Sequence, residues 1–263
     1  MGSNSKPWVD GPYKLIEPSV VGDDVHKRAT GSARLAAEMA LVHNTFIRGI
    51  NAVYLQCINV GKRGTLKDQL DFANFASQWV KFIGEHHKME ETDIFPGINE
   101  VCGVPGFMDA SVEEHEAFHD GLETYEAYLG SVIDGKEKYS GEKLKGIIDS
   151  FMPALELHLS NELQTLLRLS EFEDKVDWPK WFEEVVAVHA KRMLDDPKYK
   201  STIVPLAFIL HEKDYGNGVW AHFPPVPWFA HLLIRWMYVP THQDWWRFAG
   251  CDPKSNPKEL PFA

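Results

Sequence analysis

The spacing of apolar residues between residues 32 and 170 indicates four helices. In each of four stretches an apolar residue recurs every three or four positions, which places these residues on one face of an α-helix. The expected helices begin near Ser32, Thr65 and Ser111 and, after a loop of residues 130–141, shortly before Ile147. Four amphipathic helices of this length predict an antiparallel four-helix bundle, and therefore an all-α fold.

Capping residues and helix breakers set the expected boundaries. Thr65 with Asp68, and Ser111 with Glu114, have the spacing of a capping box, in which two side chains bond to each other's backbone N–H groups. Pro153 falls inside the fourth stretch, so it is expected either to lie in the first turn of that helix or to kink a longer helix. The residues expected to end the four helices are Gly61 and Gly64, then Pro96 and Gly97, then Gly130, and a position near Ser170.

The remaining segments differ in composition from the bundle, residues 32–170. Residues 1–31 carry three prolines without periodicity and are expected to form an extended arm. Residues 171–263 hold seven of the nine tryptophans and ten of the 16 prolines. One helix is expected there from Pro179 to Leu194, with shorter helical pieces near Ile203 and Trp228. So much aromatic surface predicts an extension packed on the bundle rather than a solvated tail.

Composition excludes several classes of protein. The 263 residues include 27 Lys and Arg against 38 Asp and Glu, a formal net charge of -11, so binding to nucleic acid is not expected. Three widely separated cysteines argue against a disulfide framework or a zinc-thiolate site. The longest apolar run, from Ile203 to Leu210, is too short to span a bilayer, and the first residues lack a leader pattern. These features predict a cytoplasmic protein without a membrane partner.

Seven polar residues interrupt the apolar stripes and are expected to point inward. They are His43, His86, Glu90, His115, His119, His158 and Glu162. Three pairs of them are four positions apart, which on a helix separates two side chains by about 40° in direction and about 6 Å in height. Leaving these groups unpaired in a dry bundle centre would cost several kcal/mol each, so cations are expected to offset that cost.

The donor set indicates two metal ions. Five histidines and two glutamates are too many ligands for one tetrahedral zinc, and carboxylates can bridge two ions. One histidine on an apolar stripe is usually a hydrogen-bonded core residue, but four helices that each supply donors at matched depth favour a metal site. We expect a dinuclear site with nitrogen and oxygen ligands and without sulfur, occupied by iron, with manganese and zinc as the alternatives.

The order and spacing of these residues resemble the hemerythrin or HHE cation-binding domain. The match covers roughly residues 33–170 and includes the run HHKMEETDIFP at 86–96. The resemblance implies two iron ions, oxo- or hydroxo-bridged, with an open position for dioxygen on the two-histidine iron. The implied ligands are His115, His119 and His158 for one iron, His43 and His86 for the other, and Glu90 and Glu162 as bridges.

Two features separate the chain from the oxygen carriers of that family. Glu162 follows His158 by four residues, where the carriers have an Asp at five. The ending WWRFAGCD at 245–252 resembles the tails of fungal hemerythrin-like proteins.

The other histidines have less distinctive settings. His87 is expected to make a helix contact or to orient a ligand, and His189 to be a core residue. For the residues His211, His222, His231 and His242 we expect structural hydrogen bonds, with a substrate pocket as the alternative. Cys57 continues the first apolar stripe and is expected in the core.

Three functions fit this sequence. The first is a non-haem di-iron oxidase or oxygenase with dioxygen as co-substrate, in which the extension forms a pocket for a small organic substrate. The second is a reversible oxygen-binding or storage protein. The third is a sensor or scavenger of nitric oxide, peroxide or iron. We favour the enzyme because a carrier needs only the bundle. Five imidazoles favour reversible or mild chemistry, so we expect oxidation, dehydrogenation or peroxide chemistry rather than hydroxylation of unactivated C–H bonds.

Overall fold

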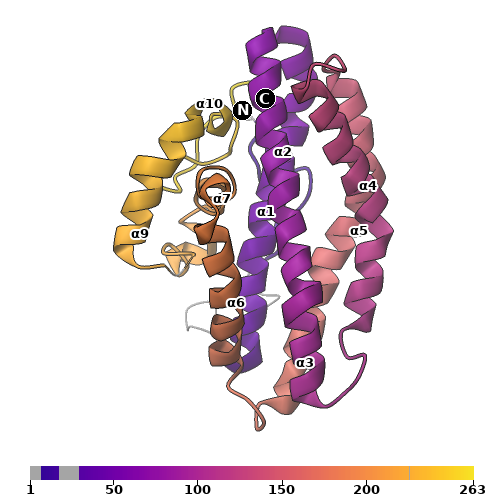
Figure 1. Ribbon diagram of the computed structural model, residues 1–263, viewed down its shortest axis with the longest axis vertical. Helices are drawn as coiled ribbons and strands as arrows, with labels where there is room; N and C mark the ends of the chain where they lie inside the picture. The colour runs from indigo at the N-terminus through magenta and orange to yellow at the C-terminus, as the bar shows by residue number, and fades with distance from the viewer. Residues whose placement is uncertain (1–6, 18–29, 225) are drawn as a thin grey trace, which may run out of the picture.

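The computed structural model describes residues 7–17, 30–224 and 226–263 (Figure 1). These residues form helices and no strand, so the predicted all-α fold is confirmed. Four long helices make the bundle: α1 (Gly31–Arg63), α2 (Leu66–Met89), α4 (Asp109–Ile133) and α5 (Gly141–Leu167). Each packs against two others, in the closed order α1, α2, α4, α5.

Aromatic side chains fill the bundle core. Trp79 on α2 is fully buried and donates its indole N–H to the carbonyl oxygen of Phe46 on α1 at 2.9 Å. Gly49 makes this contact possible, because a Cβ atom there would lie 2.4 Å from the Trp79 ring. Cys57 is buried on the same helix, as its place in the apolar stripe predicted. Such close packing holds the polar side chains of the centre in fixed positions.

The turn between α1 and α2 confirms one predicted boundary and corrects another. Helix α1 continues through Gly61 and ends at Gly64, so the expectation that Gly61 would stop it was wrong. Gly61 lies close to Gly141 at the start of α5, where a Cβ atom at Gly141 would lie 2.2 Å from the Cys57 carbonyl oxygen. The capping box of Thr65 with Asp68 is present at the start of α2.

The second bundle helix does not break at Pro96, contrary to the prediction; it continues as one rod from Leu66 to Cys102. Helix α2 passes without interruption into a π-helical turn, η2 (Glu90–Ile94), and then into α3 (Phe95–Cys102). Pro96 lies in the first turn of α3, where its missing N–H removes no necessary bond. The rod ends at Gly103, which has the left-handed φ of 67°. The π-turn begins at Glu90, one of the expected metal ligands.

Helix α4 starts earlier than predicted. It begins at Asp109, and Ser111 is a buried residue inside the helix rather than its cap. The helix also runs past Gly130 to Ile133. Helix α5 begins at Gly141 and is capped by Ser140, whose hydroxyl accepts a hydrogen bond from the Lys143 N–H at 3.2 Å.

The segment after α5 packs against one side of the bundle (Figure 1). Its helices are α6 (Trp178–Asp195), α7 (Pro197–Thr202), α8 (Leu206–Ile209), α9 (Trp228–Leu233) and α10 (Gln243–Trp246). Helix α6, predicted at 179–194, contacts α1 and η2, while α10 contacts α2. Of its tryptophans, Trp178 and Trp246 are buried, whereas Trp228 and Trp236 are 74% and 78% exposed. The extension thus packs against α1 and α2.

No helix in the described part of the chain combines the length and the apolar character needed to cross a membrane.

Candidate metal centre

One group of four donors lies between α1, α2 and α5. It consists of His43, His86, Glu90 and Glu162, and one ligand atom from each lies within 4.8 Å of the others. The Nε2 atom of His43 is 3.2 Å from Oε2 of Glu162, and Nε2 of His86 is 2.8 Å from Oε1 of Glu90. The two Nε2 atoms are 3.4 Å apart. All four side chains are buried.

A second group of four lies between α2, α4 and α5. It consists of His87, Glu90, His115 and His158, again with one ligand atom from each within 4.8 Å of the others. The Nε2 atoms of His115 and His158 are 3.1 Å apart, and Nε2 of His115 is 3.6 Å from Oε2 of Glu90. Glu90 therefore faces one group with each of its carboxylate oxygens.

Glu162 also reaches toward both groups. Its Oε2 atom is 3.2 Å from Nε2 of His43 and 4.0 Å from Nε2 of His158. Two buried carboxylates thus lie between two sets of imidazoles, and a carboxylate in such a position can bridge two cations.

The structure brings six of the seven expected residues together and leaves His119 outside. The side chain of His119 is 64% exposed, and its ring lies near Asp120 and Glu123 at the surface. The expectation that all seven point inward was therefore wrong. On α4 the buried stripe continues from His115 to Phe118, and Gly121 sits against Phe151 of α5. That packing rotates position 119 away from the centre.

His87 occupies the space that had been assigned to His119. It is buried, its ring centroid is 4.4 Å from that of His115, and its Nε2 atom has no hydrogen-bond partner among the described residues. His86 and His87 are about 100° apart on α2, so one faces α1 and the other α4. The sequence signal for His87 was the adjacent pair of histidines, each four residues before a glutamate.

Hydrogen bonds at Nδ1 orient three of the imidazoles. His43 Nδ1 lies 2.8 Å from the Leu159 carbonyl oxygen. His115 Nδ1 lies 2.6 Å from Glu91, and His158 Nδ1 lies 3.2 Å from Glu114. Carbonyl and carboxylate oxygens only accept, so each Nδ1 carries the proton and each Nε2 presents a lone pair to the centre. Carboxylates behind ligand histidines are typical of metal sites.

Burial makes charge unfavourable in this centre. Desolvation lowers the pKa of His86 and His87 well below the usual range, and it lowers that of His158 to about 2. Burial and the nearby Glu162 raise the pKa of Glu90 well above its usual value. The Nε2 atoms of His115 and His158, whose protons are held on Nδ1, face each other across 3.1 Å.

The carboxylates of the centre also lack donors. No hydrogen-bond donor among the described residues reaches any of the four oxygens of Glu90 and Glu162. Buried acceptors without donors are costly, and cations between the two groups would satisfy both the oxygens and the imidazole lone pairs. The residues present therefore fit two metal ions with nitrogen and oxygen ligands.

The remaining histidines lie outside this centre. His211 is buried and donates its Nε2–H to the Trp220 carbonyl oxygen at 2.9 Å, as expected of a structural residue. His242 stacks on Trp245, and His231 contacts the edge of Phe208. His189 is only half-buried on α6, so it is not the core residue that the apolar stripe predicted. His222 is exposed.

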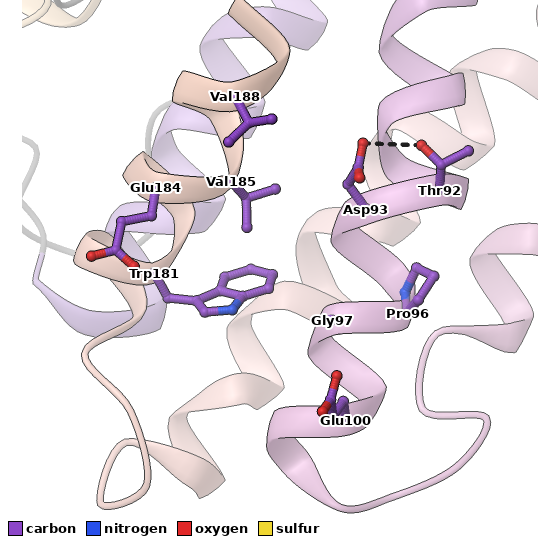
Figure 2. A pocket seen from close by; sticks show the side chains of 9 residues that line it. All are labelled: Thr92, Asp93, Pro96, Gly97, Glu100, Trp181, Glu184, Val185 and Val188. Atoms are coloured by element: carbon purple, nitrogen blue, oxygen red, sulfur yellow. Dashed lines mark hydrogen bonds between the residues drawn. The ribbon is translucent and has the colours of Figure 1, made fainter.

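A cavity of about 460 Å³, open at the surface, lies between α6 and the rod formed by η2 and α3 (Figure 2). Trp181 of α6 points toward α3 and packs on Gly97, where a Cβ atom would lie 2.6 Å from the indole. Val185 and Val188 add apolar wall, while Asp93 faces them from η2. This cavity joins the extension to the helical turn that carries Glu90.

Comparisons with known proteins agree with this geometry. The family model described as the hemerythrin HHE cation binding domain matches residues 34–170. The chain is also similar to the dimeric xanthone biosynthesis cluster protein R11 of Cryptosporiopsis sp. (strain 8999), with 34% identity over 262 residues. That alignment covers 98% of this chain and 94% of the relative, so it includes the extension. No solved structure matches the chain.

A family model that spans more than half of the chain, and a relative similar over nearly all of it, give the same assignment. Both are consistent with the buried histidines and glutamates of the bundle. The chain belongs to the hemerythrin HHE cation-binding domain family.

Proposed function

We propose that the chain is a non-haem di-iron protein that binds and activates dioxygen to oxidise a small organic substrate. The observation that carries this proposal is the pair of buried groups of imidazole nitrogens and carboxylate oxygens, in which the carboxylate oxygens have no hydrogen-bond partner among the described residues. Family membership supports iron as the ion of this proposal.

The geometry supports a specific division of ligands. His87, His115 and His158 would hold one ion, and His43 and His86 the other. Glu90 and Glu162 would bind both, since each lies between the two sets of imidazoles. The donor set remains five histidines and two glutamates, with His87 in place of His119.

Two bound iron ions would supply the electrons and the open coordination that reduction of dioxygen requires. The chain's own residues hold this centre rigid and dry. Glu91 and Glu114 keep the protons of His115 and His158 on Nδ1, which leaves Nε2 available as a ligand. Buried Phe46 and Phe118 exclude water from either side of the imidazoles.

The cavity between α6 and α3 is our proposed substrate site. Its volume of about 460 Å³ lies within the usual range for small-molecule pockets, roughly 300–1,000 Å³. The indole of Trp181 offers a flat surface for an aromatic substrate. Asp93, Glu100 and Glu184 line the same cavity and would repel an anion, so a neutral substrate is favoured.

The relative's name adds a chemical class. It refers to a dimeric xanthone biosynthesis cluster, and we extend that class to this chain as a proposal. A neutral hydroxylated polycyclic aromatic compound fits the Trp181 wall and can be oxidised readily. The simplest balanced reaction removes two electrons and two protons from the substrate and reduces one dioxygen to hydrogen peroxide.

Oxygen uptake tests this proposal. Chain reconstituted anaerobically with ferrous iron is mixed with air-saturated buffer and a panel of hydroxylated xanthones, and dissolved oxygen and peroxide are followed. We expect catalytic uptake that needs both iron and a xanthone. Trp181→Ala should raise KM, while Trp228→Ala, a change at an exposed tryptophan, should leave KM unchanged. Uptake that stops after one dioxygen per chain for every substrate would contradict the enzyme.

Reversible oxygen binding is the second candidate. The observation that favours it is the composition of the site, which has five imidazoles and only two carboxylates. Anionic oxygen ligands stabilise high oxidation states of iron, so a site with few of them favours reversible oxygen binding. The same experiment separates the two functions. A carrier would give a coloured oxygenated species that is reversed by removal of oxygen, without peroxide and without loss of any aromatic compound.

A further inference from the structure

The outer face of α1 carries three polar residues that the extension and the N-terminal segment cover. Asn44, Arg48 and Asn51 are four and three positions apart, so they lie on one face of the helix. Asn44 bonds to the backbone N–H and carbonyl of Ile16 at 2.8 and 3.1 Å. Asn51 bonds to the backbone of Tyr13 at 3.0 and 2.8 Å. These two asparagines fasten residues 7–17 to the bundle.

Arg48, between the two asparagines, has no such partner. It is 1% exposed, and none of its three guanidinium nitrogens has a hydrogen-bond partner in the described chain. The ring of Tyr215 lies 5.3 Å from the guanidinium carbon. Cys251, Glu212 and Asp10 are the other ionisable groups that influence its charge, and none of them forms an ion pair or a hydrogen bond with it. In water, all five N–H groups of a guanidinium donate hydrogen bonds to solvent. Burying the charged group without replacing those hydrogen bonds is strongly unfavourable.

The residues around Arg48 come from the extension. Tyr215 donates its hydroxyl to the Ile16 carbonyl oxygen and so joins the extension to the N-terminal segment. His211 is fully buried, and its Nε2–H is used by the Trp220 carbonyl oxygen. Its Nδ1 therefore presents a lone pair, and that atom also lacks a partner among the described residues. The ring of Phe223 lies 5.4 Å from the His211 ring, between centroids.

We propose that Arg48 anchors a buried site for a small organic oxyanion, a carboxylate, held between α1, the N-terminal segment and the extension. A planar carboxylate accepts two parallel N–H bonds from a guanidinium, which satisfies the group that the chain leaves bare. A hydroxyl next to the carboxylate would donate to Nδ1 of His211, so hydroxycarboxylates fit both orphan groups. The ring of Tyr215 beside the guanidinium would provide an apolar wall.

This site is separate from the candidate metal centre. Arg48 follows His43 by five residues, which turns its side chain by about 140° around α1. His43 faces the bundle centre, whereas Arg48 faces the extension. Because the ligand would touch α1, Tyr215 and His211 together, its binding would stabilise the docked extension. Failure of this proposal would leave the di-iron proposal unaffected.

Thermal unfolding of the full chain tests the site. Midpoints are measured in acetate, lactate, salicylate, phosphate and chloride at equal ionic strength, with and without bound iron. We expect lactate or salicylate to raise the wild-type midpoint by about 5 °C near saturation, more than acetate and with chloride inactive. Phosphate separates an inorganic oxyanion from an organic one, because a shift with phosphate alone would contradict a carboxylate site.

Two variants give the comparison. Arg48→Met removes the charge while keeping a long side chain, and it should abolish the shift. Arg34→Met, on the same helix but partly exposed and paired with Glu38, should retain it. Equal shifts in wild type and Arg48→Met would overturn the proposal, as would the absence of any carboxylate shift in wild type, which would mean that buried waters satisfy Arg48.

A measurement on the wild-type chain alone covers the case in which Arg48→Met does not fold. Calorimetric titration with salicylate should show one binding site per chain. Native mass spectrometry should show one bound salicylate per chain, which excess lactate displaces. A binding heat that does not saturate, or the absence of a salicylate adduct, would overturn the proposal.

Discussion

The imidazole ring of His87 on α2 lies 4.4 Å from that of His115 on α4, measured between ring centroids. His87 is 8% exposed, whereas the His119 side chain, one turn beyond His115, is 64% exposed. The third histidine of this group therefore comes from α2 and not from α4. The proposed site still has one ion bound by three histidines and one bound by two. Helix α2 contributes one histidine to each ion, His87 to the first and His86 to the second, and Glu90 directly after α2 belongs to both groups.

This arrangement predicts opposite results for two histidine variants. His87→Ala should lower bound iron from close to two per chain toward one, because it removes a donor from the centre. His119→Ala should leave iron binding unchanged, because its ring is at the surface. Metal analysis after anaerobic reconstitution gives the counts. Loss of iron in His119→Ala with full binding in His87→Ala would restore the ligand set expected from sequence.

The carboxylates behind the histidines give a second prediction. Glu91→Gln places an amide oxygen or an amide N–H at Nδ1 of His115, 2.6 Å away in the wild type, and weakens the orientation of that ring. We expect two irons still to bind, with affinity reduced by roughly 10–100-fold. Competition with a chelator measures the affinity. Glu113→Gln, an exposed change on α4, is the control and should have no effect. A full loss of iron in Glu91→Gln would mean that Glu91 is itself a ligand.

Apolar periodicity was sufficient to predict the four bundle helices because their buried faces are long and regular. It also placed His43, His86, Glu90, His115, His158 and Glu162 at one depth, since all six continue apolar stripes. Boundaries were less predictable. Pro96 was expected to break the rod. In the structure the π-turn before it accommodates a residue without an N–H group, and the spacing of apolar residues gives no sign of a π-turn.

His119 and His87 show why local spacing could not complete the site. A four-residue spacing leaves a side chain about 40° from its partner, and a small rotation of the helix decides whether it faces inward or outward. Here that rotation is set by the contact of Gly121 with Phe151, thirty residues away in sequence. The orphan group Arg48 was equally invisible, because its surroundings come from the extension.

The same close contact predicts a stability difference between two glycines of α4. A Cβ atom at Gly121 would lie 2.4 Å from Cβ of Phe151, whereas nothing lies within 4 Å of one at Gly130. Gly121→Ala should therefore destabilise the chain by about 1–3 kcal/mol by pushing α4 from α5. Gly130→Ala should be stabilising by about 0.5–1 kcal/mol, because alanine favours helix. Urea unfolding of both variants measures the difference, and equal midpoints would contradict the packing.

Acid should destabilise the metal-free chain well above the pKa of its carboxylates. Burial lowers the pKa of His86 and His87 well below the usual range, and it lowers those of His158 and His211 to about 2 and about 4. Below pH 6.5 the unfolded chain binds protons that the folded chain does not, so stability falls as pH falls. Glu90 opposes this by one proton, because its pKa is raised.

Histidines with a lowered pKa outnumber this one carboxyl, so the net effect is a loss of folding stability as the pH falls below about 6. Because total stability is only about 5–15 kcal/mol, the metal-free chain should unfold in acid, with the loss of stability beginning below about pH 6. Circular dichroism against pH gives the midpoint. Bound iron should move it to lower pH, since protons must then displace the metal from Nε2. His87→Gln should flatten the pH dependence while His119→Gln should not, and an equal slope in wild type and His87→Gln would show that the buried imidazole is not what titrates.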